Sequence, residues 1–90
     1  MEAVERRFRE LKAVFDAMPA GREKDVARAE WLGVGFVLAV EPERKLDELK
    51  HYISQVEWFR GYDKPGNREI HKATLKGLRW ALGQLESAPR

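Results

Sequence analysis

Three residues spaced along the segment 43–60 place an acid, a base and a hydroxyl on one predicted helix face: Asp47, His51 and Ser54. At 100° per residue they lie within an arc of about 60°. Asp, His and Ser are the residue types of a hydrolytic triad, in which the base must be aimed at the nucleophile. Side chains on successive turns of one straight helix project side by side instead. We therefore expect no catalytic residues here and predict that the protein is not an enzyme.

Metal chemistry has little support in the sequence. The two histidines, His51 and His71, belong to different segments and match no ligand-spaced motif, and the absence of cysteine excludes thiolate ligands. The nearest approach to the clustered carboxylates that hold Mg²⁺ is Glu43, Asp47 and Glu48, and no second acidic cluster faces them. We predict no metal and no cofactor. A small helical metal-dependent phosphohydrolase is the third and least favoured function.

Four cations of the segment 67–86 give the strongest functional signal. They fall within about 80° of one another around the helix axis, and only Glu69 interrupts the positive charge. Several cations along one line suit contacts with phosphate groups, and an adjacent aromatic ring can stack on a base. The alternative interpretation is an ordinary solvated helix face. The basic stripe, as we name it, consists of Arg68, Lys72, Lys76 and Arg79.

Further candidate partner-binding residues flank the basic stripe. Lys64 extends it into the preceding loop, and Trp80 lies at its edge. Trp58 is a large ring on the otherwise polar face of 43–60, so either another helix of the chain or a partner must cover it. We expect the chain itself to do so. Tyr62, like Trp58, lies outside the core-facing positions, and both remain candidate partner contacts.

The element most informative about the fold is an apolar run, residues 31–40, which contains no polar side chain. Crossing a bilayer as a helix needs about twenty residues, so this run must be covered by the chain or by a partner. It marks the centre of a core and makes a homo-oligomer possible. A helix is favoured because no other segment alternates with period two. A strand would require pairing across a dimer.

The remaining segments repeat apolar residues every three or four positions, which predicts helices over about 2–18, 43–60 and 67–86. Small residues predict that the segments 23–40 and 67–86 cross closely. Pro42 marks either a tight reversal or a kink between collinear helices. The predicted fold is all-α, a single domain (1–90) forming a bundle of about four helices with 31–40 at its centre. The small residues of the crossing are Ala29 and Gly33 on one segment and Ala73, Gly77 and Ala81 on the other.

Composition limits the class of protein. The 90 residues include 17 Lys and Arg against 15 Asp and Glu, for a net charge of +2. Residues 58–90 carry 7 against 3, so the basic character belongs to the last third. The charged start lacks the apolar stretch of a signal peptide, which makes the cytoplasm the default location. Few amides and many charges are typical of thermophiles, although a GC-rich genome produces a similar balance.

These features predict a small non-catalytic helical accessory or regulatory module. It would bind a larger protein or nucleoprotein assembly, mainly through the basic face of the C-terminal helix. The alternative is a protein that binds DNA or RNA directly through the same basic stripe. No membrane partner is expected.

Overall fold

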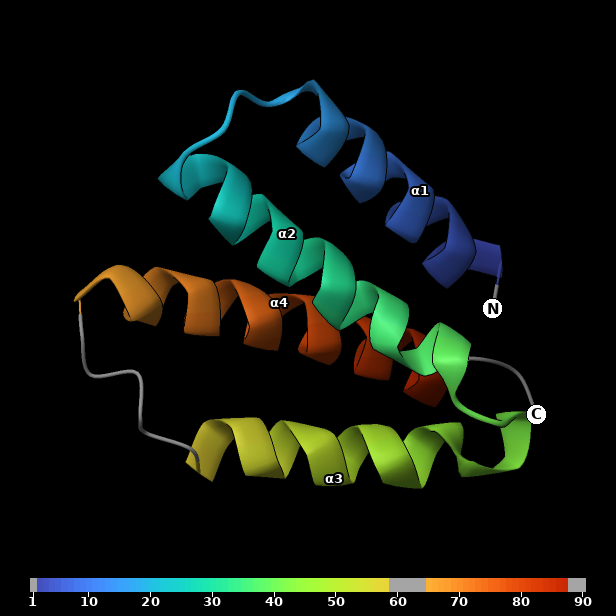
Figure 1. Cartoon of the computed structure of the whole chain (residues 1–90). Coiled ribbons are helices and arrows are strands. Elements are labelled where there is room, and N and C mark those ends of the chain that lie inside the picture. Colours follow the sequence, from blue (N-terminus) through green and yellow to red (C-terminus); the bar gives the residue numbers. More distant parts are fainter. Residues whose placement is uncertain (1, 59–64, 88–90) are drawn as a thin grey trace.

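The computed structural model describes residues 2–58 and 65–87. Helices account for 92% of these described residues, and none of them belongs to a strand, which confirms the all-α prediction. The described part of the chain forms four α-helices, and the connection between the second and the third contains two 3₁₀ turns (Figure 1). The elements are α1 (Glu2–Ala17), α2 (Arg22–Gly35), η1 (Phe36–Ala39), η2 (Pro42–Arg44), α3 (Lys45–Trp58) and α4 (Pro65–Ser87).

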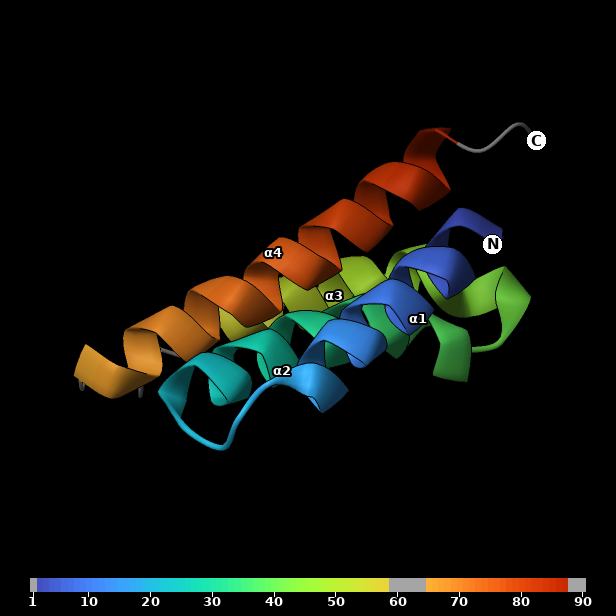
Figure 2. The ribbon, with the colours of Figure 1, turned by 90° about the horizontal axis from the view of Figure 1, so that it is seen from above.

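Helix α4 is the common packing partner of α2 and α3. Both α2 and α3 pack on α4, whereas α2 and α3 make little direct contact with each other. Figure 1 shows α2 and α3 on either side of α4, and Figure 2 shows that α4 lies behind both. Helix α1 packs on the outer side of α2. The apolar run therefore lies between α1 and α4, at the centre of the bundle as predicted.

The backbones of α2 and α4 touch where they cross. A Cβ atom at Gly33 would lie 2.7 Å from the carbonyl oxygen of Thr74. A Cβ atom at Gly77 would lie 2.9 Å from the backbone nitrogen of Val34 and closer still to the carbonyl oxygen of Glu30. Each glycine costs about 1 kcal/mol of helix propensity relative to alanine. The close approach that it permits confirms the crossing predicted from the small residues.

The apolar run continues beyond α2 as the 3₁₀ helix η1 and then reverses. Val40 and Glu41 are extended, and for Glu41 this is the conformation expected of the residue before a proline. The backbone N–H of Arg44 donates to the carbonyl oxygen of Glu41 at 3.0 Å, and Lys45 Nζ donates to that of Val37. Helix α3 then runs back antiparallel to α2 (Figure 1). Pro42 thus belongs to a tight reversal rather than to a kink.

All four helices contribute to one apolar core, but the apolar run is not fully covered by its own chain. Val34 and Val37 are buried, and the ring of Trp31 lies between those of Phe8 and Phe15, at 5.5 and 5.4 Å. Leu32, by contrast, is 47% exposed. The chain itself therefore does not cover the apolar run on every side. The buried core consists of Val4, Val34, Val37, Leu49, Ile53, Leu75, Leu78 and Ala81.

None of the described helices is both long enough and apolar enough to span a membrane.

Candidate protein-binding groove

The basic stripe lies on the exposed back of α4, and the chain itself pairs half of it. Lys76 Nζ lies 3.3 Å from a carboxylate oxygen of Glu30 on α2. A guanidinium nitrogen of Arg79 lies 3.3 Å from Glu57 on α3. Arg68 and Lys72 are exposed and form no ion pair within the described part of the chain. The free positive charge is therefore concentrated on the first two cations of the stripe.

The two tryptophans proposed as partner contacts differ in exposure: Trp80 packs against the core, and Trp58 protrudes into solvent. Trp80 is half-buried against the core, with the Arg7 guanidinium 6.0 Å from its ring centre. Trp58 is 83% exposed at the end of α3. The expectation that the chain covers Trp58 is therefore wrong, because none of the described helices packs over this side chain. Tyr62 and Lys64 lie outside the described residues.

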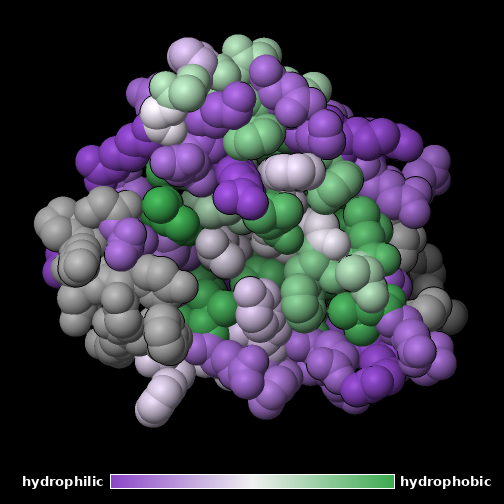
Figure 3. All heavy atoms as spheres, viewed as in Figure 1, coloured by the Kyte–Doolittle hydropathy of each residue, from purple (hydrophilic) through white to green (hydrophobic). Residues whose placement is uncertain are grey.

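A groove opens beside Trp58, where α2 and α3 diverge over α4. One hollow, of about 520 Å³, lies between α3 and α4. An adjoining hollow of about 370 Å³ lies between α2 and α4. Both are lined by Tyr52, Ile70 and Thr74, so they form one continuous depression, the α2–α3 groove. Figure 3 shows hydrophobic and near-neutral residues gathered in the middle of this face, with hydrophilic residues above and below.

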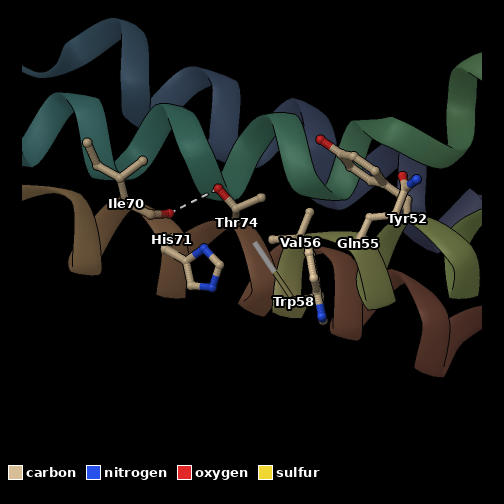
Figure 4. A pocket seen from close by; sticks show the side chains of 7 residues that line it. All are labelled: Tyr52, Gln55, Val56, Trp58, Ile70, His71 and Thr74. Carbon is tan, nitrogen blue, oxygen red and sulfur yellow. Dashed lines mark hydrogen bonds between the residues drawn. The ribbon is translucent and has the colours of Figure 1, made fainter. Parts of the chain in front are cut away.

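Helix periodicity places the lining residues. Positions spaced by three and four residues turn one strip toward the groove, from Ala29 and Leu32 on α2 to Phe36 at the start of η1. Helix α3 contributes its C-terminal half, including Val56 and Trp58, as Figure 4 shows. The floor residues of α4 lie about 180° around the helix from the basic stripe. The groove and the stripe are thus on opposite sides of α4.

One polar group of the groove floor is already engaged within the chain. The Thr74 hydroxyl donates to the carbonyl oxygen of Ile70 in its own helix at 2.9 Å (Figure 4). At the η1 end, the rings of Phe36 and Tyr52 stack with centroids 4.4 Å apart and planes inclined by 16°. The groove therefore combines apolar and aromatic side chains with polar ones such as Gln55 and His71.

The residues considered as a catalytic triad or as metal ligands do not form a site in the structure. Asp47, His51 and Ser54 are all exposed on α3, and no hydrogen bond joins them. Within residues 2–58 and 65–87, no group of three or more His, Asp or Glu side chains is placed to hold a metal ion.

Comparisons with protein-family models, with curated proteins and with solved structures found no match. The α2–α3 groove and the basic stripe are therefore the two surfaces from which a function can be inferred. The sequence drew attention to Trp58 but not to the groove floor. The one sequence feature that could have indicated the groove floor is Ile70. This apolar residue lies outside the leucine positions of its helix and one turn before Thr74.

Proposed function

We propose that this protein is a non-catalytic helical module that binds an apolar helical surface of another protein chain in the α2–α3 groove. One observation carries the proposal: two large apolar side chains, Leu32 at 47% and Trp58 at 83% exposure, stand on opposite walls of one continuous depression. Single exposed apolar residues are common on protein surfaces. Two that flank the same apolar hollow are typical of a binding site.

The arrangement of the helices supports an occupant that is itself helical. In a four-helix bundle each helix packs on two neighbours around a shared core. Here α2, α4 and α3 occupy three corners, and α1 packs on the outer side of α2 instead of between α2 and α3. The fourth corner is the α2–α3 groove. An amphipathic helix laid there would bury its apolar face against the groove floor, a recurring mode of protein recognition.

We expect the double variant Leu32→Glu, Trp58→Glu to lose its protein partners while keeping its helix content. Both side chains are largely exposed, so their replacement leaves the core intact. Loss of a buried tryptophan anchor costs about 2 kcal/mol or more, which weakens binding about thirtyfold or more. The measurement is quantitative mass spectrometry of proteins that co-purify with each variant from nuclease-treated extract.

Val14→Glu is the matched control, because Val14 is a 54% exposed apolar residue on α1, away from the groove. This control should retain the partners of the parent chain. Retention of the same partners by the groove double variant would exclude the groove as their binding site.

The basic stripe supports a second candidate function, binding of an acidic partner such as DNA or RNA. The observation that favours it is the pair Arg68 and Lys72, exposed on α4 and without an ion pair among the described residues. Cations left free in this way can release counterions from phosphates. The paired half of the stripe contributes less, since Glu30 and Glu57 already neutralise it.

For this candidate, we expect Arg68→Glu with Lys72→Glu to weaken nucleic-acid binding at least about tenfold. The slope of log affinity against log salt should also fall by about 0.9 for each lost contact with duplex phosphates. Lys76 is left unchanged, because its reversal would place two carboxylates together beside α2. Fluorescence anisotropy with a labelled duplex at several salt concentrations measures both quantities.

The control is reversal of Arg6 and Arg9, which are exposed on α1 among acidic neighbours. Equal affinities and slopes for all three proteins would identify the basic stripe as an ordinary solvated face.

A further inference from the structure

We infer that the partner helix inserts a tryptophan or tyrosine side chain into the hollow between α3 and α4, the half of the α2–α3 groove beside Trp58. We name this half the α3–α4 hollow. The inference rests on the proposed function, because it names the chemistry of the group that the same groove receives. Three features of the α3–α4 hollow support it: its charge, its unpaired polar groups and its aromatic side chains.

The two halves of the groove differ in charge. The described lining of the hollow between α2 and α4 includes the exposed side chains of Asp25 and Arg28. The described lining of the α3–α4 hollow includes no Asp, Glu, Lys or Arg. A charged side chain inserted there would lose water without gaining a partner of opposite charge, which is strongly unfavourable. The α3–α4 hollow therefore favours an uncharged group.

Two hydrogen-bonding side chains of α3 line the α3–α4 hollow. Tyr52 and Gln55 lie one turn apart, and within residues 2–58 and 65–87 neither the phenol hydroxyl nor the side-chain amide forms a hydrogen bond. An aliphatic occupant would displace water from these groups and leave them unpaired, which opposes its binding. An occupant with an N–H or O–H group at its edge can pair with them instead.

An exposed ring stands beside these polar groups. Trp58, from the end of α3, is 83% exposed and packs on no other ring in the described part of the chain. Aromatic pairs gain more from their contact than the area they bury, so a second ring against Trp58 is favoured. The α3–α4 hollow, of about 520 Å³, has room for such a ring and contains His71 on its α4 side (Figure 4). Tryptophan and tyrosine each combine a large ring with one polar group.

Titration of the isotopically labelled whole chain with N-acetyl-tryptophanamide tests the inference without the partner. This probe should bind with a dissociation constant on the order of 1 mM. The shifted signals should be the amides of Gln55 and His71 and the indole N–H of Trp58. N-acetyl-leucinamide, the matched aliphatic probe, should bind about fivefold more weakly or worse. Equal affinities for the two probes, or shifts confined to residues outside the α3–α4 hollow, would overturn the inference.

The double variant Tyr52→Phe, Gln55→Leu tests the polar edge. The parent should bind N-acetyl-tyrosinamide about fivefold more tightly than N-acetyl-phenylalaninamide, which differs only by the hydroxyl, and the variant should lose this preference. The phenylalanine keeps the ring that stacks on Phe36, so the far-ultraviolet spectrum should not change. Ser54→Ala, an exposed change on α3 outside the hollow, is the control. No preference in the parent, or an equal preference in the variant, would contradict the inference.

Photo-crosslinking identifies the group that the partner supplies. A benzophenone side chain at the exposed position 55 should crosslink to a partner segment that contains tryptophan or tyrosine within about one helical turn. Replacement of that residue by leucine should weaken binding about tenfold or more. A crosslinked segment without either residue, or a replacement without effect, would exclude an aromatic anchor.

The co-purification experiment separates this inference from the proposed function. If the groove double variant Leu32→Glu, Trp58→Glu keeps every co-purifying protein, the proposed function fails and the inference fails with it. If that variant loses its partners but the leucine probe binds as tightly as the tryptophan probe, only the aromatic anchor is excluded.

Discussion

Replacing Gly77 by alanine is expected to lower the free energy of unfolding by about 3 kcal/mol or more, a large part of the roughly 5–15 kcal/mol that a domain has in total. The new methyl group would lie 2.9 Å from the backbone nitrogen of Val34 and closer to the carbonyl oxygen of Glu30. Both are backbone atoms of α2, so the clash can be relieved only by separating α2 from α4. That crossing is the most extensive helix contact of the fold.

The control lies in the same helix. A Cβ atom at Gly83 would meet no atom within 4 Å. Gly83→Ala should therefore stabilise the protein by up to about 1 kcal/mol, through helix propensity alone. Urea denaturation followed by circular dichroism measures both changes. Equal midpoints for the two variants would show that α2 and α4 do not approach as closely as the structure indicates.

Val37→Asp is expected to abolish folding. Val37 is fully buried in the core, and an unpaired carboxylate at such a site costs several kcal/mol. Phe36→Asp should be milder, because the Phe36 ring is only partly buried at the end of the groove, where it stacks on Tyr52. Circular dichroism and thermal melting of both variants measure the difference. A folded Val37→Asp variant with the melting curve of the parent would show that residues 31–40 are not the core.

The periodicity of apolar residues and the positions of small residues were sufficient to predict the helices and the crossing of α2 with α4. Apolar residues every three or four positions gave the three amphipathic helices, because burial of one helix face is a local property of the sequence. The α2–α4 crossing followed from two notches of small side chains, at Gly33 and Gly77, which can only face each other if the helices lie close. The 3₁₀ turn of η1 was not predicted, since it depends on the reversal at Pro42 and on a hydrogen bond from Lys45.

The groove could not be predicted, because periodicity identifies the face that a helix buries but not the neighbour that buries it. Whether α1 closes the bundle between α2 and α3 or packs outside α2 decides whether Leu32 and Trp58 are covered. The same limit applies to the basic stripe. Its pairing with Glu30 and Glu57 depends on which helices lie on either side of α4, and no spacing within the C-terminal segment contains that information.

Amide chemical shifts of the isotopically labelled whole chain, recorded with and without the protein that co-purifies with it, test most directly the claim that the α2–α3 groove is the binding surface. The expected changes cluster at Leu32, Tyr52 and Thr74, together with the indole N–H of Trp58, and are absent from the Leu32→Glu, Trp58→Glu variant. Changes centred on Arg68 and Lys72, or changes that leave every groove residue unaffected, would contradict the account.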